Sequence, residues 1–336
     1  MSAVLTYAKS TTKPIRKKQR PIEISTAFTD VIQMLEILFL GTGASVPSRD
    51  RVMPCVAVRH GSNIILFDCG EGSQRQLMLS PFSFMKVVGI FITHMHGDHV
   101  LGLPGLLQTM SLSGRKEPLI VCGPKGFEKG LNAVLSVCEG AIGYPLEIRE
   151  MECGETVKFQ EFEVSSFPNE HDVPSLGYVF RENDIRGKFD KKKAISLGIK
   201  PGPDYSRLQN GESVGNVRSE MVMGPPRKGF TVVYSGDTVP CEGLTEASSG
   251  ADVLIHESTF SEKHSELAKE HWHSTATQAA TTAKECGCRA LMLTHISNRY
   301  DDKNIIKEEA KKIFENVFLP NDLDMYRVSD ENIKLV

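Results

Sequence analysis

The chain contains 336 residues, of which 40% are hydrophobic and 24% charged, a composition typical of a globular protein with a large core. Its formal net charge of -3 excludes a protein that coats nucleic acid through its overall charge, so any such contact has to come from local basic patches. No apolar run approaches the roughly 20 residues of a membrane-spanning helix, which excludes an integral membrane protein. The eight cysteines are scattered through apolar segments, and without a signal peptide we expect reduced thiols and a cytoplasmic location.

The first 33 residues form a basic segment in which six Lys and Arg residues precede Glu23, the first acidic residue. Ser, Thr and Pro separate them, and a segment of this composition is expected to be disordered. Three interpretations stay open: a start assigned upstream of the true one at Met34, an electrostatic arm for RNA, and a targeting presequence, which the lack of an amphipathic pattern disfavours. We expect residues 34–336 to form a single domain.

The rest of the chain alternates short apolar runs with turns rich in Gly, Pro and Asp. We predict strands at residues 35–40, 55–60, 63–68, 87–93, 119–122, 163–167, 176–180, 231–234, 252–256 and 290–294. We predict helices at residues 71–79, 98–107, 124–137, 275–285 and 303–314. The fourth helix has Thr275 and Gln278 at the spacing of a capping box. Several strands are too continuously apolar to have an exposed face, so we expect sheets covered by helices in a layered α/β fold.

Between residues 181 and 228 the apolar periodicity fades, and Lys, Gly and Pro become frequent. A long irregular stretch inside a compact domain is usually either functional or disordered. We therefore expect residues 181–228 to be either functional or disordered.

Residues 93–99 (THMHGDH) place three imidazoles and one carboxylate directly after an apolar strand. His94 and His96, two residues apart on an extended segment, can point to one side and bind one ion. Asp98 and His99 lie where a helix begins and can reach a second ion. Nitrogen and oxygen ligands for two ions favour zinc, and manganese stays open. A surface loop that merely collects histidines is the weaker interpretation.

Further ligands are expected at the ends of later strands, because the sites of layered α/β folds gather there. His171, Asp237 and His295 each lie just beyond a predicted strand. Taken singly, each would be interpreted as a structural residue at a turn. Together with the histidine motif they predict one metal site.

These residues resemble the metallo-β-lactamase superfamily and, within it, the ribonuclease Z family. The resemblance covers residues 34 to about 300, and the histidine motif is specific for the superfamily, whereas the later motifs indicate the family. Its motifs lie at residues 39–43 (FLGTG), 67–76 (FDCGEGSQRQ), 102–106 (GLPGL), 171–180 (HDVPSLGYVF), 197–203 (LGIKPGP), 235–238 (SGDT), 256–260 (HESTF), 273–275 (HST) and 295–300 (HISNRY).

The resemblance implies a four-layer αββα sandwich from which a flexible, RNA-binding arm protrudes at about residues 183–228. It implies a zinc-dependent endoribonuclease that removes the 3′ trailer from precursor tRNA and leaves a 3′-hydroxyl on the tRNA. The chemistry would be the attack of a metal-activated hydroxide on phosphorus. It also implies a homodimer in which the arm of one subunit serves the active site of the other.

Carried over by residue, the resemblance implies two zinc ions per chain, held by His94, His96, His171, Asp98, His99 and His295, with Asp237 between the two ions. Asp98 is also implied to be catalytic. Glu257 and His273 match a pair that protonates the leaving 3′ oxygen, and His271 lies close enough in sequence to exchange roles with His273. Asp68 is interpreted either as orienting a metal-bound imidazole or as forming a turn.

RNA contacts are implied for basic residues of the arm and of two loops: Arg49, Arg51, Lys188, Lys191, Lys192, Lys193, Lys200 and Arg299. Such contacts go to phosphates and read no bases. Tyr300, next to Arg299, is equally well interpreted as a packing residue. Bacterial relatives carry Pro-x-Lys-x-Arg-Asn, a motif that disfavours tRNAs already ending in CCA, whereas residues 47–52 here are PSRDRV. This discrimination is therefore not carried over.

Three other functions are less consistent with the sequence. Another hydrolase of the superfamily, such as a phosphodiesterase or an arylsulfatase, would keep the metal ligands but lack the Gly-Pro arm and the Glu257 and His273 pair. A non-catalytic RNA-binding scaffold on this fold would be expected to have lost a ligand, and none is lost. A structural zinc protein would favour Cys-rich sites, and the only close pair, Cys286 and Cys288, is a weak match.

Overall fold

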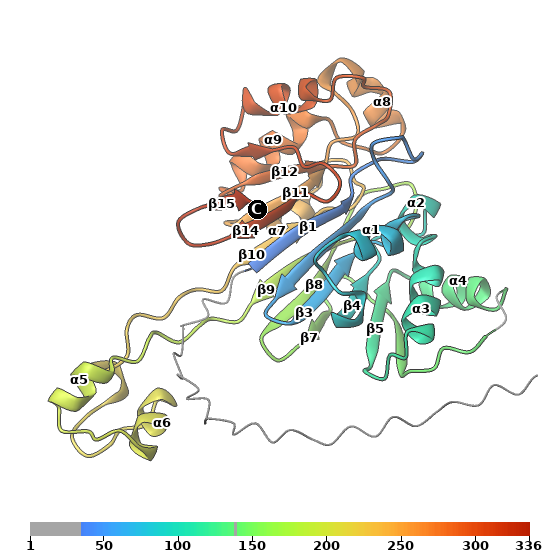
Figure 1. Cartoon of the computed structure of the whole chain (residues 1–336). Helices are drawn as coiled ribbons and strands as arrows, with labels where there is room; N and C mark the ends of the chain where they lie inside the picture. Colours follow the sequence, from blue (N-terminus) through green and yellow to red (C-terminus); the bar gives the residue numbers. More distant parts are fainter. Residues whose placement is uncertain (1–34, 138–139) are drawn as a thin grey trace, which may run out of the picture. The chain divides into compact units, whose positions relative to one another are not determined.

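Two β-sheets stacked face to face form the centre of this computed structural model, which describes residues 35–137 and 140–336 (Figure 1). The first sheet contains β1 (Leu35–Gly41), β2 (Cys55–His60), β3 (Asn63–Phe67), β4 (Val87–Phe91), β5 (Leu119–Gly123), β6 (Leu146–Glu150), β14 (Met325–Val328) and β15 (Ile333–Leu335). Its order is β15-β14-β1-β2-β3-β4-β5-β6, antiparallel as far as β3 and parallel from β3 to β6.

The second sheet contains β7 (Thr156–Lys158), β8 (Phe162–Pro168), β9 (Leu176–Glu182), β10 (Thr231–Tyr234), β11 (Val253–Glu257), β12 (Leu291–Thr294) and β13 (Val317–Phe318). Its order is β13-β12-β11-β10-β9-β8-β7, with β10 to β13 parallel. Parallel strands run in one direction, so their carboxyl ends meet at one edge of the sheet. That edge carries the residues discussed below.

Helices cover the outer face of each sheet, which completes the predicted αββα sandwich. The α-helices of the described residues are α1 (Ser73–Leu79), α2 (Gly97–Val100), α3 (Leu103–Leu112), α4 (Phe127–Leu135), α5 (Lys191–Ser196), α6 (Pro203–Gln209), α7 (Glu242–Ser248), α8 (Ser265–Glu270), α9 (Ala276–Glu285) and α10 (Asn304–Lys311). Of these, α5 and α6 belong to the insertion between β9 and β10 and do not cover a sheet. One apolar cluster joins α1, α3 and α4 to the first sheet, and another joins α7, α9 and α10 to the second. Within the described residues no helix is both long and apolar enough to cross a membrane.

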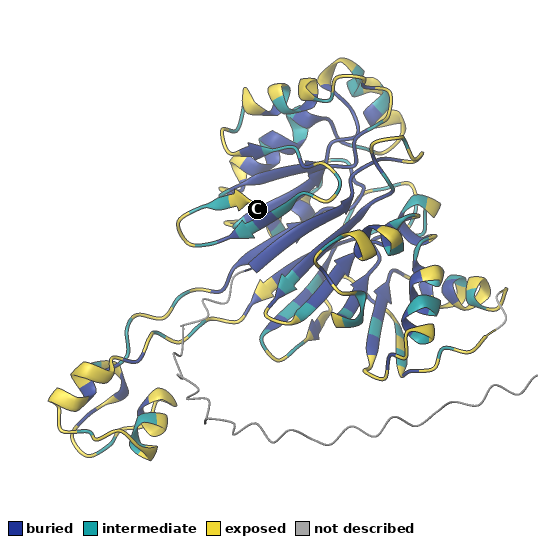
Figure 2. Cartoon of the chain, in the orientation of Figure 1, coloured by how far each residue is buried: buried dark blue, intermediate teal, exposed yellow. Residues whose placement is uncertain are grey.

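The strands of both sheets are largely buried (Figure 2). The core between them consists mainly of aromatic and β-branched side chains. The ring of Phe67 on β3 stacks on Tyr178 and on Tyr234 of the opposite sheet, with centroids 6.0 Å and 5.3 Å away. Each fully buried aromatic ring contributes on the order of 2 kcal/mol through burial alone. Tyr234 also donates its hydroxyl to Asp68 at 2.8 Å, so the core continues directly into the polar residues at the strand ends.

Most predicted elements agree with the structure to within a few residues, and the capping box at Thr275 and Gln278 is present. The helix predicted at residues 98–107 is wrong as a single element, because it is divided into α2 and α3. A Cβ atom on Gly102 would lie 1.9 Å from the Gly70 carbonyl oxygen, so this close approach fixes where the chain breaks. Short elements such as β6, β7, α7 and α8 were not predicted.

The insertion between β9 and β10, here called the arm (residues 183–228), contains two short helices, which the sequence does not predict. Helices α5 and α6 pack around a small apolar cluster of Phe189, Ala194, Leu208, Val217 and Val222. Asp190 caps α5 by accepting a hydrogen bond from the Lys193 amide at 2.9 Å. These apolar residues are spaced irregularly between polar turns, so no periodic signal marks them in the sequence.

The two ends of the arm are held together where they leave the sheet. Buried Glu182 accepts two hydrogen bonds from Arg227 at 3.0 Å each, one from the Phe230 amide at 3.0 Å, and contacts His60 at 3.0 Å. Ile185 and Arg227 exchange backbone hydrogen bonds of 2.9 Å. The base of the arm is therefore fixed, and Figure 1 shows α5 and α6 at the end of the two connections that begin there.

Candidate metal centre and active site

All seven residues predicted as metal ligands lie at one edge of the sandwich, beyond the ends of strands from both sheets. His94, His96, Asp98 and His99 follow β4, in the loop that leads into α2. His171 lies between β8 and β9, Asp237 follows β10 and His295 follows β12. Three groups with ligand atoms within 4.8 Å of one another contain all of them: His94 with His96 and His171, His94 with His99 and Asp237, and Asp98 with His99 and His295.

Asp237 occupies the middle of this cluster. Its Oδ2 atom lies 3.2 Å from Nε2 of His99, 3.3 Å from Nε2 of His295 and 3.8 Å from Nε2 of His94. Its Oδ1 atom is buried and has no hydrogen-bond partner among the described residues. Burial alone would raise the pKa of Asp237, but His295 and His99 hold it well below its ordinary value. The residue is therefore an ionised carboxylate with a free oxygen, which suits a cation.

Two imidazoles have their tautomers fixed by Asp68, which is fully buried. His99 donates Nδ1–H to Asp68 Oδ2 at 2.8 Å. The hydroxyl of Thr93 lies 3.0 Å from both Asp68 oxygens and donates to that carboxylate, so it accepts Nδ1–H from His94 at 3.0 Å. Nε2 of both rings therefore faces Asp237 in the cluster. Burial would lower the pKa of His99, but Asp237 and Asp68 raise it well above its ordinary value. Of the two predicted roles for Asp68, the orienting contact is present, together with a left-handed backbone at φ 58°.

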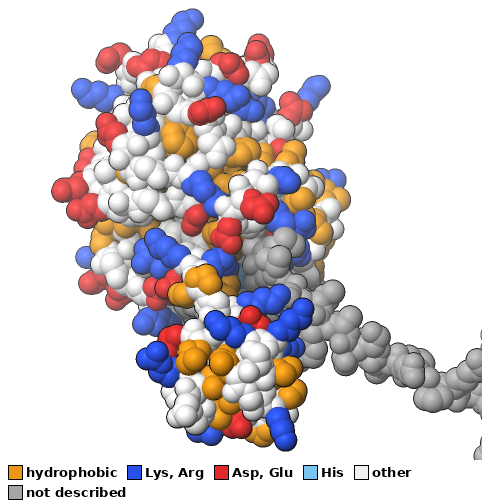
Figure 3. All heavy atoms as spheres, turned by 90° about the vertical axis from the view of Figure 1, so that its left-hand side faces the viewer, with side chains coloured by type: hydrophobic (Ala, Val, Ile, Leu, Met, Phe, Trp, Pro, Cys, Tyr) orange, Lys and Arg blue, Asp and Glu red, His pale blue; other side chains and the backbone are white. Residues whose placement is uncertain are grey.

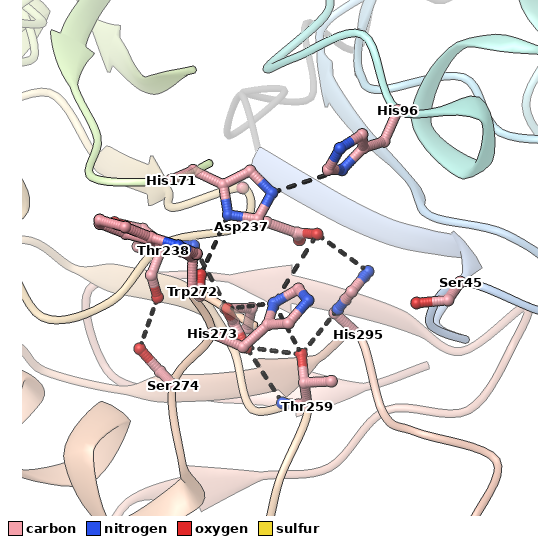
Figure 4. Close-up of polar contacts among 12 residues, drawn as sticks. Ser45, His96, His171, Asp237, Thr238, Thr259, Trp272, His273, Ser274 and His295 are labelled. Atoms are coloured by element: carbon pink, nitrogen blue, oxygen red, sulfur yellow. Dashed lines mark hydrogen bonds and ion pairs between the residues drawn. The ribbon is translucent and has the colours of Figure 1, made fainter. Parts of the chain in front are cut away.

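The other two buried imidazoles are held in the same way. His171 donates Nδ1–H to the backbone carbonyl of Trp272 at 3.0 Å, since a carbonyl can only accept (Figure 4). Thr259 donates its hydroxyl to Glu257 at 2.6 Å and therefore accepts Nδ1–H from His295 at 2.8 Å. The Nε2 atoms of four histidines thus face the cluster around Asp237: those of His94, His99, His171 and His295.

Imidazole nitrogens lie close to one another around Asp237 and His94, an arrangement that suits a cation between them. Nε2 of His99 and Nε2 of His295 lie 3.4 Å apart, and Nδ1 of His96 lies 3.1 Å from Nε2 of His94 and 3.4 Å from Nε2 of His171. Burial lowers the pKa of His94 and of His171, which favours the neutral imidazole that a metal needs. Imidazoles and carboxylates in one cluster, with Nδ1 of His94, His99, His171 and His295 engaged outside it, fit zinc.

Asp98 faces the same centre from the first turn of α2. Its Oδ2 atom lies 3.5 Å from Nε2 of His295 and 3.6 Å from Nε2 of His99, and it accepts a hydrogen bond from the Ser45 amide at 2.8 Å. Burial would raise its pKa, but His295 and His99 hold it below the usual range. Asp98 is therefore a second ionised carboxylate at the centre.

Backbone strain concentrates around this cluster. Among the described residues, the non-glycine positions with positive φ are Ser45, Asp68, Trp272, His295 and Leu323, and all except Leu323 contact the site. Such conformations cost free energy for residues with a Cβ atom, and they persist only where the surrounding structure enforces them. The fold therefore holds these four residues where the site needs them rather than where the local chain is most relaxed.

Glu257 and His273 form a hydrogen-bonded pair beside the cluster. His273 donates Nδ1–H to Glu257 Oε1 at 2.8 Å, and the Thr238 and Thr259 amides donate to the two carboxylate oxygens at 3.2 Å and 3.0 Å. Burial lowers the pKa of His273, but Glu257 outweighs this and raises it to about 9. His271 is exposed, and its ring lies along Phe260. The arrangement thus assigns the pairing with Glu257 to His273, which the sequence had left open.

Arg51, predicted to contact RNA, is instead held inside the protein. It is 4% exposed, contacts the Thr42 hydroxyl and donates to the carbonyl oxygen of Pro320 at 2.9 Å. A guanidinium engaged in this way ties the loop to the C-terminal segment and is not available to a phosphate. This prediction is therefore wrong.

The other predicted RNA contacts are all exposed: Arg49, Lys188, Lys191, Lys192, Lys193, Lys200 and Arg299. The guanidinium of Arg299 lies 4.8 Å from the centroid of the Phe260 ring. Tyr300 is a packing residue, because its hydroxyl contacts the Ser261 amide and His264 at 2.8 Å each.

Several residues that shape the site were not predicted: Thr93, Thr238, Thr259, Tyr234, Trp272 and Asp172. Asp172 follows His171 and places Oδ1 3.1 Å from its Nε2 atom and 3.6 Å from Nε2 of His96. Only its position beside His171 could have drawn attention to it in the sequence. The threonines carry no sequence signal of their own, because hydroxyls at strand ends are common and their role depends on which imidazole lies next to them.

Comparison with known proteins agrees with this geometry. The family model described as anti-Pycsar protein Apyc1 matches residues 35–186, and that of the beta-lactamase superfamily domain matches residues 208–296. The ribonuclease Z of Methanosarcina acetivorans is 46% identical over 295 residues, which are 86% of this chain and 97% of that protein. The ribonuclease Z of Bacillus licheniformis is 42% identical over 290 residues, 83% of this chain and 94% of that protein.

Solved structures show the same similarity. The crystal structure of human tRNase Z, short form, has a TM-score of 0.64 at 29% identity and covers 88% of this chain and 98% of its own. The metallo-β-lactamase fold protein YhfI from Bacillus subtilis, at 16% identity and a TM-score of 0.66, covers 88% of this chain and 100% of its own and supports the fold alone. The chain has the metallo-β-lactamase fold and belongs to the ribonuclease Z family.

Proposed function

We propose that this protein is the endonuclease that removes the 3′ trailer from precursor tRNA, as the name of its relatives indicates. The observation that carries the proposal is that a cluster of candidate metal ligands and a possible proton donor lie side by side at one edge of the sheets. Four imidazoles present fixed Nε2 atoms around Asp237, and the Glu257 and His273 pair lies beside them. The histidine cluster suits a metal centre for phosphodiester hydrolysis, and the Glu257 and His273 pair suits protonation of a leaving oxygen.

Two zinc ions are proposed as the cofactor. His94, His96 and His171 would hold one ion, and Asp98, His99 and His295 the other, with Asp237 between them. When bound, such a pair activates water and neutralises charge on the phosphate. Asp68 and Glu257 keep the imidazoles in the ligating tautomer through Thr93 and Thr259.

His273 would act on the leaving group. Its Nδ1–H is taken by Glu257, so Nε2 is the atom that can hand a proton to the 3′ oxygen of the tRNA. Glu257 orients the ring and favours its protonated form, which is the state a general acid needs. The fourth possible metal group, His273 with Asp237 and His295, is less suitable, because the His273 atom near Asp237 is Nδ1, 3.9 Å from Oδ2, and this atom already donates to Glu257.

The arm is proposed to bind the tRNA outside the active site. Figure 3 looks onto the arm, where Lys and Arg side chains surround a group of apolar ones. Three consecutive lysines, Lys191 to Lys193, begin α5 and are exposed. Exposed lysines on a firmly anchored insertion can contact phosphates without reading bases. A homodimer and a cytoplasmic location, both expected from the resemblance, stay predictions.

Cleavage of a precursor tRNA tests the proposed function. The zinc-loaded protein is incubated with a 3′-extended precursor, and the ends of the products are mapped. We expect one cut near the end of the acceptor stem, a 3′-hydroxyl on the tRNA and a 5′-phosphate on the trailer. Hydrolysis of bis(p-nitrophenyl) phosphate without cleavage of the precursor would favour another phosphodiesterase of the same fold.

The arm lysines give a prediction of their own. Replacing Lys191, Lys192 and Lys193 by alanine should raise KM for precursor tRNA about tenfold near physiological salt, because up to three phosphate contacts are lost. Each lost contact should also reduce the slope of log affinity against log salt by a little less than 1.

The matched control for the arm lysines replaces Lys307, Lys311 and Lys312 on and just after α10, which removes the same charge from another surface. Equal effects of the two triple variants on KM and on the salt slope would show that only net charge matters and that the arm is not the contact surface.

A further inference from the structure

Trp272, the only tryptophan of the chain, is 45% exposed. It is also the only aromatic residue among the large hydrophobic side chains that are exposed in the described part of the chain. An indole that is nearly half exposed adds little to the core, and exposed aromatic side chains are the surfaces on which bases of single-stranded nucleic acids stack.

The backbone at Trp272 makes this residue more unusual. It follows the end of α8, where the Trp272 amide donates to the Lys269 carbonyl at 3.4 Å and the His273 amide to the Ala268 carbonyl at 2.8 Å. This is the pattern of a Schellman motif, whose left-handed position is usually glycine. Trp272 adopts it at φ 57°. Glycine would form the same turn without strain, so the turn itself does not require a tryptophan.

The backbone of Trp272 lies at the proposed active site. Its backbone carbonyl accepts Nδ1–H from His171, a proposed metal ligand, at 3.0 Å (Figure 4). The next residue along the chain is His273, the proposed proton donor to the leaving oxygen. Trp272 thus contacts one group of the proposed site and directly precedes another in the chain.

We propose that Trp272 is a stacking platform for the base of an unpaired nucleotide that flanks the cleaved phosphodiester. The inference rests on the proposed function, since it requires a single-stranded RNA end at the site. Every base has a flat face, so an indole can hold the strand without selecting its sequence, as a processing enzyme for many tRNAs requires. The stack would position the phosphate, which makes Trp272 a positioning residue.

Tryptophan fluorescence reports this stack directly, because no other tryptophan contributes. The zinc-loaded protein is mixed rapidly with precursor tRNA, and emission is recorded before cleavage. We expect strong quenching, and much weaker quenching with an otherwise identical RNA truncated at its last base pair, which keeps the tRNA body but lacks unpaired nucleotides. Equal quenching by the two RNAs, or none by either, would overturn the proposal.

Kinetics of two variants separate stacking from backbone effects. In Trp272→Gly, which suits the left-handed backbone, the ratio of kcat/KM for precursor tRNA to kcat/KM for bis(p-nitrophenyl) phosphate should fall roughly 5- to 100-fold, the worth of one base–aromatic stack. Trp272→Phe should restore most of that ratio. A ratio within twofold of wild type in Trp272→Gly, or no restoration by Phe, contradicts the inference.

A substrate with an abasic nucleotide identifies the stacked base. Placed on one side of the cut, the abasic nucleotide should remove the difference between wild type and Trp272→Gly. If the difference persists with an abasic nucleotide on either side, the indole does not stack on a flanking base. If wild-type protein does not cut precursor tRNA at all, the proposed function fails instead, and the two failures are distinguishable.

Discussion

Asp237→Ala is expected to lower RNA cleavage by about 10³-fold or more and to reduce bound zinc from about two ions per chain to one or fewer. The reason is the central position of this carboxylate, whose Oδ2 lies 3.2 Å and 3.3 Å from Nε2 of His99 and His295 while Oδ1 is buried without a partner. Without the Asp237 carboxylate, no negative charge lies between the surrounding imidazoles to offset the charge of two bound cations. Metal analysis and single-turnover cleavage measure the two effects.

A matched control for Asp237→Ala is Glu170→Ala, which removes one carboxylate from an exposed residue next to His171. We expect it to keep both ions and nearly full activity. Active Asp237→Ala protein that still holds two ions would contradict the assignment of Asp237 to the space between them. Thermal unfolding with and without a chelator separates loss of metal from loss of fold, since bound metal stabilises only the folded state.

The convergence of the seven candidate ligands could be predicted from the sequence, because each lies next to a recognisable strand. Apolar strands are recognisable, and parallel strands bring their carboxyl ends to one edge, so polar residues just after them converge. His171, Asp237 and His295 lie far apart in the chain, yet each follows or precedes a strand of the second sheet. The layered fold follows from the same apolar strands, which need covering on both faces.

What the sequence could not indicate depends on contacts between distant segments. Arg51 is buried by Pro320, a neighbour 269 positions along the chain, so nothing near Arg51 distinguishes it from an exposed basic residue. The hydroxyl of Thr259 gains its role only because Glu257 and His295 lie on either side of it. The small core of the arm is equally hidden, because its five apolar residues have no common period.

His273→Ala is expected to slow cleavage of precursor tRNA by roughly 10²- to 10⁴-fold, the usual contribution of a positioned general acid. Metal content and tRNA affinity should change little, because His273 donates to Glu257 rather than to a proposed ligand. Glu257→Ala should also be slow, and the double variant little slower than His273→Ala, since two residues that act as one unit are not additive. Single-turnover rates of the three variants measure this.

The leaving group decides whether the lost function of His273 is proton donation. An RNA 3′ oxygen needs a proton as it leaves, whereas p-nitrophenolate needs little help, so the defect of His273→Ala should shrink markedly on bis(p-nitrophenyl) phosphate. His271→Ala is the matched control, because it removes an exposed imidazole two residues away that does not contact Glu257. An equal defect of His273→Ala on both substrates would rule out the general acid and assign His273 to holding the metal centre in shape through Glu257 and Thr259.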